Sequence, residues 1–268
     1  MKFSIKKISF VAVFTILVFI LIFLCNIVYT PLISKLFFEN YLDSILDKDA
    51  NNIFTIDKIV LFSSCNAEST INSNSTTTIN NLTQYTDIAI FINNSIDDDF
   101  SAENTLKSVA IKDFSFNTTP SSGNPNLYYK NLHNFATPDI VEENLISSDL
   151  DFSVSSEDEI DYNTPTLFNN CANPITLSYV NSAITNNYTI ENTDNAITYD
   201  GSLLKKCNIL LSDLSCNFSF TVYIENNLGQ KFRCPVYISI PLENDVSSIY
   251  DGNYTYTYNP NYSFLMYE

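Results

Sequence analysis

Several residue types that functional sites commonly need are scarce in this chain of 268 residues. It has no Trp, one His, four Gly and a single Arg, Arg233. The lone histidine, His133, excludes any metal site built from several histidines. Four glycines argue against a phosphate-binding loop, because such loops use several glycines to bring the backbone close to the phosphate.

Positive charge is scarce as well. The chain has 13 Lys and Arg against 30 Asp and Glu, which gives a formal net charge of −17. Nucleic-acid binding depends on Lys and Arg that neutralise phosphates. The composition therefore argues against a nucleic-acid partner.

Residues 8–33 form a long apolar run without any charged residue. As a helix this run would measure about 39 Å at ~1.5 Å per residue, enough to cross a hydrocarbon layer of ~30 Å. It is longer than the ~7–15 apolar residues of a cleaved signal peptide, and no small-residue cleavage site follows it. We therefore expect an uncleaved signal-anchor in the lipid bilayer, with a cleaved signal as the alternative.

Charge around this run predicts its orientation. Three of residues 1–7 are Lys, whereas Lys35 is soon followed by Glu39 and Asp43. The positive-inside rule then places residues 1–7 in the cytoplasm and the C-terminal domain outside a single-pass protein of the cell membrane. Residues 34–52 keep helical spacing of apolar residues and are expected to form a juxtamembrane helix or stalk.

Residues 53–268 are expected to form an extracytoplasmic all-β domain. Short runs of β-branched and aromatic residues alternate there with Asn, Ser and Asp clusters, a pattern typical of strands and turns. The Ser-, Thr- and Asn-rich stretch 66–84 is predicted to be a polar loop. The predicted strands are 54–63, 86–93, 105–117, 174–181, 186–191, 196–200, 206–211, 216–226, 230–240 and 253–266.

A β-hairpin over 216–240 is the most strongly specified element. Apolar and polar residues alternate on both arms, and Asn227-Leu228-Gly229 lies between them. A three-residue loop with Gly229 in the left-handed conformation pairs Ile224 with Phe232 and Val222 with Cys234. This register places every apolar side chain on one face, whereas a slip of one residue would scatter them.

The end of the chain around this hairpin resembles an immunoglobulin-like sandwich. A predicted strand at 206–211, a short Leu/Asp turn and a long hairpin follow one another, as at the E–F–G end of that fold. The predicted fold class is therefore an immunoglobulin-like antiparallel β-sandwich behind one N-terminal transmembrane helix. Residues 139–161 carry nine carboxylates and no Lys or Arg, so two small β domains split near 139–165 are the alternative. A bulge or a change of sheet is expected near Lys112-Asp113, because the apolar parity changes there.

Five cysteines lie outside the apolar run: Cys65, Cys171, Cys207, Cys216 and Cys234. The predicted hairpin register separates Cys216 from Cys234 by ~20 Å along the strands, which excludes a disulfide between them. We expect mostly buried thiols, with a Cys171–Cys207 bridge as the alternative. The absence of a C-x-x-C pair argues against a zinc or thioredoxin-like site.

Candidate sites are few and weakly supported. No catalytic residue or cofactor is predicted, and His133 is interpreted as a loop residue. Carboxylate oxygens could collect around Ca²⁺, although no EF-hand pattern is present. The calcium candidates are Asp97, Asp98, Asp99, Glu157, Asp158, Glu159 and Asp161.

The C-terminal tyrosines are the candidate partner-binding residues. They alternate with polar residues, and Asn259-Pro260-Asn261 could turn the chain into a hairpin. Such a row of rings either packs against the core or presents an aromatic face to a partner. The residues are Tyr254, Tyr256, Tyr258 and Tyr262.

These observations favour a non-enzymatic function. We expect a membrane-anchored, acidic β-sandwich that acts as a surface or envelope binding, adhesion or assembly module, with a protein or glycan partner. The alternative is an accessory subunit of a membrane complex that works through its helices. An envelope hydrolase using paired carboxylates comes third, because 30 acids make that pattern uninformative.

Overall fold

The computed structural model describes residues 14–20, 22–23, 35, 53–72, 76–94, 102–146, 150–155, 166–168, 174–185, 187–191, 197–240 and 247–267. The chain separates into two compact units, Met1–Asn51 and Asn52–Glu268. In the first unit, 14–20 and 22–23 are helical, while most of the predicted segments 8–33 and 34–52 lies outside the described residues. Among the residues that are described, no helix is both long and apolar enough to span a bilayer.

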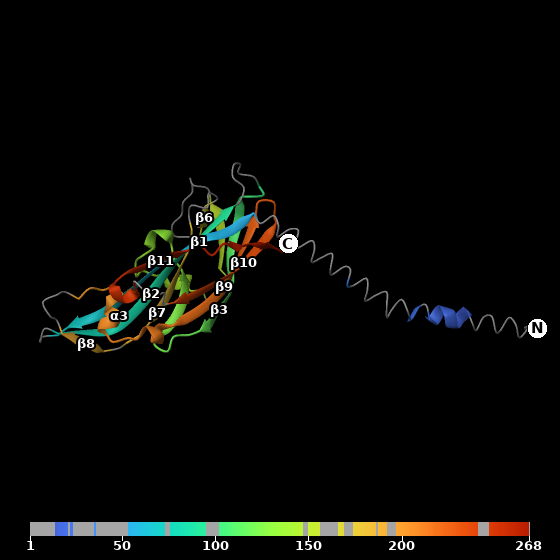
Figure 1. Cartoon of the computed structure of the whole chain (residues 1–268). Helices are drawn as coiled ribbons and strands as arrows, with labels where there is room; N and C mark the ends of the chain where they lie inside the picture. Colours follow the sequence, from blue (N-terminus) through green and yellow to red (C-terminus); the bar gives the residue numbers. More distant parts are fainter. Residues whose placement is uncertain are drawn as a thin grey trace, which may run out of the picture. The chain divides into compact units, whose positions relative to one another are not determined.

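The second unit is a sandwich of two antiparallel sheets packed together, which confirms the predicted fold class at this level (Figure 1). Within the described ranges, sheet A has the order β11-β1-β2-β7-β4, with β12 also on β1 and β8 on β2. Sheet B has the order β13-β10-β9-β3-β5-β6, in which the short β5–β6 pair is parallel and the other pairs of this order are antiparallel. The strands of sheet A are β1 (Phe54–Ile71), β2 (Thr76–Asn94), β4 (Asn124–Tyr129), β7 (Ile175–Ser182), β8 (Tyr188–Glu191), β11 (Tyr254–Tyr258) and β12 (Tyr262–Ser263). Those of sheet B are β3 (Leu106–Thr118), β5 (Leu150–Ser155), β6 (Thr166–Phe168), β9 (Cys216–Asn226), β10 (Lys231–Ile240) and β13 (Leu265–Met266).

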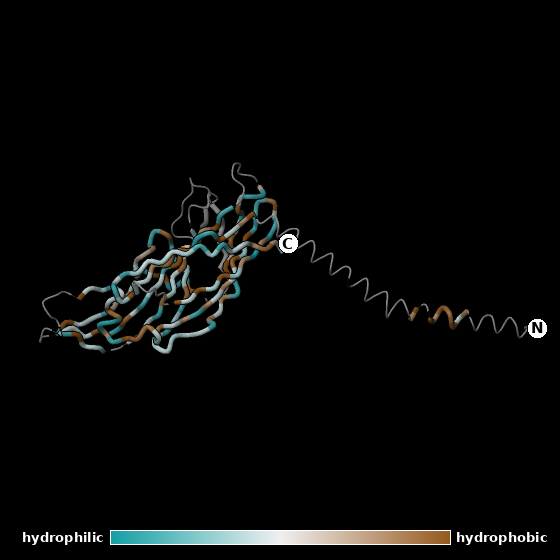
Figure 2. The backbone as a smooth tube through the Cα atoms, in the orientation of Figure 1, coloured by the Kyte–Doolittle hydropathy of each residue, from teal (hydrophilic) through white to brown (hydrophobic). Residues whose placement is uncertain are grey.

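The β9–β10 hairpin has the predicted register. Ile224 lies opposite Phe232 and Val222 opposite Cys234. Gly229 has a φ of 83°, the left-handed conformation that the three-residue loop requires. Burial alternates along both strands. Hydrophilic and hydrophobic colours likewise follow one another along the strands of the sandwich (Figure 2). The even-numbered residues of this hairpin therefore face sheet A, and the odd-numbered residues form the outer face of sheet B.

The main core lies between the two sheets. Phe218 and Phe220 of β9 are almost fully buried and meet the inward side chains of β1, β2 and β7. The rings of Phe218 and Tyr179 stack with centroids 5.7 Å apart. Burial of such side chains contributes roughly 1.5–3 kcal/mol each, so this layer holds the two sheets together.

A second core lies beside the far ends of β1 and β2 and corrects one predicted strand. Residues 206–211 do not form a strand; α3 (Ser202–Lys206) and the 3₁₀ helix η5 (Leu211–Leu214) occupy this part of the chain. Leu203, Leu204 and Cys207 are buried there against Cys65 and Leu82. The spacing of these three residues puts them on one side of a helical turn, which the strand prediction overlooked.

The predicted polar loop 66–84 is wrong, because β1 continues to Ile71 and β2 begins at Thr76. The two strands pair from Phe54 and Asn94 outward, with a bulge at Glu68/Ser69. At that bulge β2 has one extra residue, so Ile79 and Leu82 are both buried although one is odd-numbered and the other even-numbered. A strict alternation of apolar and polar residues is therefore absent from the sequence there. The Thr residues of this stretch are β-branched and suit strands.

The predicted irregularity near Lys112-Asp113 is confirmed as a bulge. The β3–β9 register shifts between Lys112 and Ser115, and Asp113 has a φ of 57°. Phe114 and Phe116 then pack against the main core, while Asp113 is exposed. The bulge therefore turns two consecutive residues, Lys112 and Asp113, towards the outer side of sheet B.

The predicted C-terminal hairpin is wrong. Tyr258 pairs with Ile59 and Tyr262 with Ile56, so β11 and β12 follow one another along the edge of β1. The chain then crosses to sheet B, where β13 pairs with β10. Pro260 has no N–H, and such a residue is tolerated at an edge strand.

The remaining differences concern short strands. Residues 197–200 form no strand, whereas β4, β5 and β6 were not predicted. β4 overlaps none of the predicted strands, and it pairs with β7 in sheet A. β5 lies within the acidic stretch 139–161 and pairs with β3 in sheet B.

Candidate functional site

The outer face of sheet B gathers basic residues in an otherwise acidic protein. Lys231 and Arg233 are odd-numbered residues of β10, and they pair with Glu225 and Tyr223 of β9. Lys107 and Lys112 come from β3, the next strand. Between residues 53 and 268 the chain has eight basic residues, of which these four share one face: Lys58, Lys107, Lys112, Lys130, Lys205, Lys206, Lys231 and Arg233.

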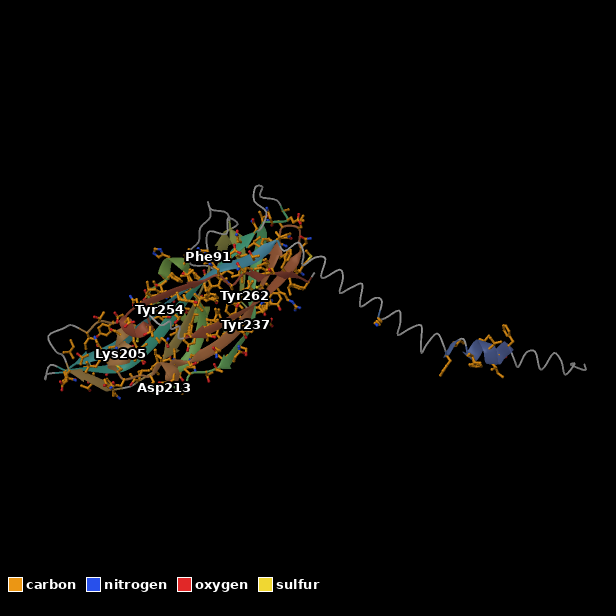
Figure 3. All side chains as sticks on the ribbon, viewed as in Figure 1. Phe91, Lys205, Asp213, Tyr237, Tyr254 and Tyr262 are labelled. Atoms are coloured by element: carbon orange, nitrogen blue, oxygen red, sulfur yellow. The ribbon has the colours of Figure 1, made fainter. Side chains whose placement is uncertain are left out.

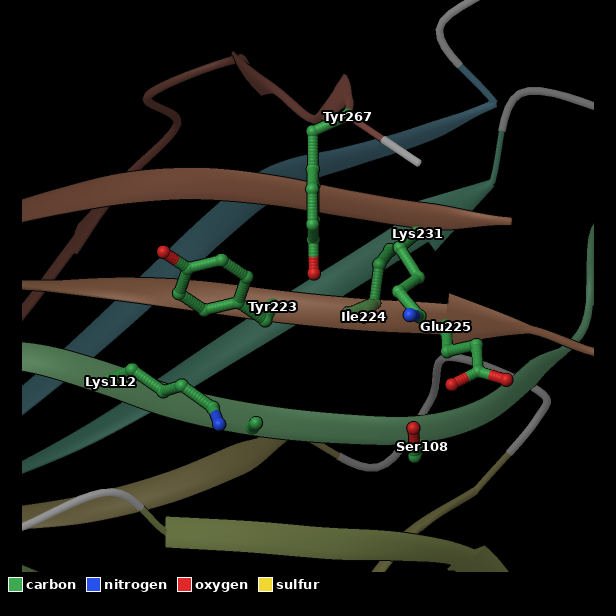
Figure 4. A pocket seen from close by; sticks show the side chains of 8 residues that line it. Ser108, Lys112, Tyr223, Ile224, Glu225, Lys231 and Tyr267 are labelled. Atoms are coloured by element: carbon green, nitrogen blue, oxygen red, sulfur yellow. The ribbon is translucent and has the colours of Figure 1, made fainter. Parts of the chain in front are cut away.

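A groove of about 410 Å³ runs across these strands (Figure 4). The Tyr267 side chain points towards β9 between Tyr223 and Lys231, and Lys112 and Ser108 lie on the other side (Figure 4). Its volume falls within the ~300–1,000 Å³ of typical ligand sites. The groove is lined by Ser108, Ala110, Lys112, Tyr223, Ile224, Glu225, Lys231 and Tyr267.

Two tyrosines line the groove, and the single arginine of the chain lies beside one of them. The rings of Tyr223 and Tyr267 meet edge to face, with centroids 5.7 Å apart and an interplanar angle of 86°. The Arg233 guanidinium lies 6.0 Å from the centroid of the Tyr267 ring. The Tyr267 N–H donates to the Lys231 carbonyl at 2.9 Å, which holds the end of the chain against β10.

Two carboxylates of this face contact groups on the neighbouring strand. Lys107 Nζ lies 2.6 Å from Glu225 Oε1, and the Tyr223 hydroxyl donates to Asp113 Oδ2 at 2.9 Å. Burial, followed by the hydrogen bond to Asp113, raises the pKa of Tyr223, so its hydroxyl stays protonated. Lys112, Lys231 and Arg233 lie on the same face as these two carboxylates.

The four candidate tyrosines lie along the edge of sheet A. Tyr254 is buried against the second core, and the other three are half-buried against the main core or its border. The Tyr256 and Tyr258 rings stack with centroids 5.9 Å apart. Burial raises the pKa of Tyr258, in keeping with a ring turned away from solvent. The residues that this strand exposes are Thr255 and Thr257.

The calcium candidates Asp97, Asp98, Asp99, Glu157, Asp158, Glu159 and Asp161 lie outside the described residues. Among the described side chains, no group of three or more His, Cys, Asp or Glu residues is placed to hold a metal ion. His133 is exposed in the 3₁₀ helix η2 (Leu132–Asn134).

Cys65, Cys207, Cys216 and Cys234 are buried and free, as predicted, while Cys171 lies outside the described residues. Burial raises the pKa of all four thiols, to about 11 for Cys207 and about 12 for Cys234. A reactive cysteine needs the opposite shift. These four thiols therefore act as small apolar core groups.

A buried ion pair on the outer side of sheet A was not predicted. Lys130 Nζ lies 2.9 and 2.8 Å from the two carboxylate oxygens of Asp87, and both side chains are almost fully buried. The Ser178 hydroxyl and the Ala136 N–H also donate to this carboxylate. Burial raises the pKa of Asp87 and lowers that of Lys130, because each charge loses its hydration.

The groove on sheet B combines cations, aromatic rings and hydroxyl groups on one three-stranded face, the kind of lining that small binding sites use. Hairpin alternation alone would have placed Tyr223, Glu225, Lys231 and Arg233 together, but the contributions of Lys112 and Tyr267 depend on distant parts of the chain. Comparison of this chain with family models, with curated proteins and with solved structures finds no match.

Proposed function

We propose that this chain is a non-enzymatic binding module of the cell surface or envelope that acts in adhesion or assembly. The observation that carries the proposal is the groove on sheet B. Lys112 and Lys231 line it in a protein of net charge −17, together with the rings of Tyr223 and Tyr267, and Arg233 lies beside Tyr267. The four buried thiols, whose pKa is raised, support a role without nucleophilic chemistry.

The anchor of this module is residues 8–33, which cross the bilayer once with residues 1–7 in the cytoplasm. The uncharged apolar run and the three lysines before it support this topology. The domain 53–268 is then displayed outside the cell, where its face is accessible to partners.

The fold of the displayed domain is immunoglobulin-like. The order β1-β2-β7-β4 corresponds to strands A-B-E-D of a constant-type immunoglobulin domain, and β10-β9-β3 corresponds to G-F-C. Strands β5 and β6 are then an addition to the free edge of the C strand. The groove lies on the outer side of the C-F-G strands, which supports a role in recognition.

A pair of charge-matched variants tests the proposal. The full chain in lipid vesicles is mixed with envelope fragments of the organism that makes it, and the bound fraction is measured. The variant Lys231→Ala/Arg233→Ala is expected to bind about tenfold less, because it removes two charge-assisted contacts. The control Lys205→Ala/Lys206→Ala removes the same charge from α3, which lies well away from Tyr237 on β10 (Figure 3).

The control is expected to bind within twofold of the unchanged chain. If the bound fraction falls equally in the two variants, binding depends on net charge alone, which would contradict a specific site on sheet B. Circular dichroism of each variant confirms that the sandwich is intact, because the substituted side chains lie outside the cores.

A further inference from the structure

The buried ion pair on the outer side of sheet A brings a primary amine into contact with a carboxyl group. Asp87 of β2 lies opposite Ser178 of β7, and Ser178 lies opposite Tyr128 of β4. Lys130 follows two residues later, and its N–H donates to the Thr176 carbonyl at 3.0 Å, which continues the pairing of β4 with β7. Alternation along the chain turns the Lys130 side chain to the outer side. The fold therefore places amine and carboxyl group against each other across three strands.

The separation of the two groups is that of reacting atoms. Lys130 Nζ lies 2.9 Å from Asp87 Oδ1 and 2.8 Å from Asp87 Oδ2. The carboxyl carbon joins these oxygens by bonds of ~1.2 Å, so the two distances put Nζ within about 3.3 Å of Asp87 Cγ. Atoms held at ~3–3.5 Å react far faster than the same groups free in water. The amine is thus held beside the carbon that it would attack.

Burial favours the neutral forms of both groups. The exposed fraction of the side chain is 2% for Lys130 and 0% for Asp87. The apolar residues Tyr85, Tyr128 and Val180 cluster on the same side of sheet A. Loss of hydration lowers the pKa of Lys130 and raises that of Asp87, so a proton passes from the ammonium to the carboxylate at a smaller cost than in water. A neutral amine is a nucleophile, and a protonated carboxyl group can lose its hydroxyl as water.

The hydrogen bonds around the pair suit both the attack and its product. The Ala136 N–H donates to Asp87 Oδ2 at 2.7 Å, and the Ser178 hydroxyl donates to Asp87 Oδ1 at 2.6 Å. A backbone N–H directed at the oxygen that becomes negative stabilises a tetrahedral intermediate. Lys130 Nζ also donates to the Thr137 carbonyl. An amide formed here would keep Ala136 as donor to its oxygen and Thr137 as acceptor for its N–H.

We propose that Lys130 Nζ and Asp87 Cγ form an intramolecular amide bond in the folded chain. A proton first passes from the ammonium to Oδ1. The nitrogen lone pair then attacks Cγ, and the electrons of the Cγ–Oδ2 double bond move to Oδ2. A second proton passes from the nitrogen to Oδ1, the Cγ–Oδ1 bond breaks, and the Cγ–Oδ2 double bond re-forms. One water leaves, the nitrogen keeps one hydrogen, and no oxidant or other reactant is consumed.

This cross-link goes beyond the proposed binding function, because it concerns how the displayed domain is held together. It joins β2 to the loop after β4 by a bond that persists when the chain unfolds. A neutral amide also avoids the cost of keeping two ions away from water. The bond forms only after folding, because folding brings the two groups together. Newly folded chain therefore contains the ion pair, and the stability that the ion pair contributes is measured in that form.

Mass spectrometry of the full chain, purified in detergent micelles and digested with trypsin at intervals over several days, tests this bond. We expect a branched peptide that joins residues 59–107 to residues 113–205 and becomes the main product. It is lighter than the two linear segments together by the mass of one water, and trypsin does not cut it after Lys130, whose charge is lost. The ion pair of Lys107 and Glu225, with Nζ and Oε1 2.6 Å apart, is the internal control. Its lysine is 59% exposed, so water hydrates it and we expect no bond there.

Two variants assign the bond to this pair. Lys130→Arg keeps a positive charge, but a guanidinium group stays protonated and does not attack a carboxyl group, so no branched peptide is expected. Lys58→Arg, the matched control on β1, is expected to form it as the unchanged chain does. A branched peptide in Lys130→Arg would assign the bond to other residues and overturn the proposal. Complete cleavage after Lys130 in the unchanged chain, with circular dichroism showing an intact sandwich, would overturn it as well.

Discussion

Replacement of Lys130 by methionine is expected to lower the free energy of unfolding by about 3–5 kcal/mol, because it leaves a buried carboxylate without its countercharge. Asp87 is fully buried, and Lys130 Nζ supplies two of its contacts, at 2.8 and 2.9 Å. Lys130 also donates to the carbonyl of Thr137. The ion pair thus fastens the loop after β4 to sheet A, so the substitution loosens the loop as well.

Chemical unfolding of the full chain in detergent micelles, followed by tyrosine fluorescence at pH 7, measures this loss. Lys58→Met is the matched control, because Lys58 is exposed with its ammonium group 4.1 Å from the Phe91 ring centroid. Lys58→Met is expected to lower the free energy of unfolding by less than about 1 kcal/mol. The double variant Lys130→Met/Asp87→Leu is expected to recover at least half of the stability. Similar losses for Lys130→Met and Lys58→Met would contradict the buried pair.

A steep loss of stability above pH 9 is the second large effect that we expect. Burial raises the pKa of Cys207 from 9.0 to about 11 and that of Cys234 from 9.0 to about 12. Above pH 9 these thiols ionise in the unfolded chain while the folded chain keeps them protonated. The contribution of these thiols to the free energy of unfolding is therefore complete below pH 9. Above pH 9 it decreases by about 1.4 kcal/mol per thiol and pH unit, until the pH reaches the pKa of that thiol in the folded chain.

The effect of one thiol is isolated by comparing two neighbours on β10. In Cys234→Ala, the decrease of the unfolding free energy between pH 9 and 11 is expected to be shallower by about 1.4 kcal/mol per pH unit than in the unchanged chain. Val236→Ala removes a fully buried side chain from the same strand. It should lower stability at every pH without altering the slope. If the slope in Cys234→Ala equals that of the unchanged chain, the Cys234 thiol ionises equally well in the folded and unfolded chains, which would contradict this prediction.

Local sequence patterns predicted the parts of the fold that depend on neighbouring residues. The β9–β10 register follows from strict alternation and from Gly229, and the β3 bulge follows from the changed parity around Lys112. Both are short-range features. The second core was missed because Leu203, Leu204 and Cys207 suit a helical turn, but only the tertiary contact with β1 favours it over a strand.

The C-terminal tyrosines show where periodicity fails to decide between two arrangements. A hairpin and a single edge strand expose the same alternate residues, so Tyr258 and Tyr262 fit both equally well. The choice depends on β1, which lies about 200 residues earlier in the chain. The groove could not be predicted from local patterns for the same reason. Lys231 and Tyr223 come from one hairpin, whereas Tyr267 reaches them only after the chain has crossed between sheets.

Lysine acetylation with and without bound envelope material tests the central claim most directly. The full chain in lipid vesicles is labelled with a water-soluble acetylating reagent, and the extent of labelling at each lysine is measured by mass spectrometry. We predict that bound material protects Lys112 and Lys231, in the groove, and leaves Lys205 and Lys206, on α3, labelled as before. Protection of Lys205 and Lys206 with full labelling of Lys112 and Lys231 would place the binding face elsewhere and contradict the account.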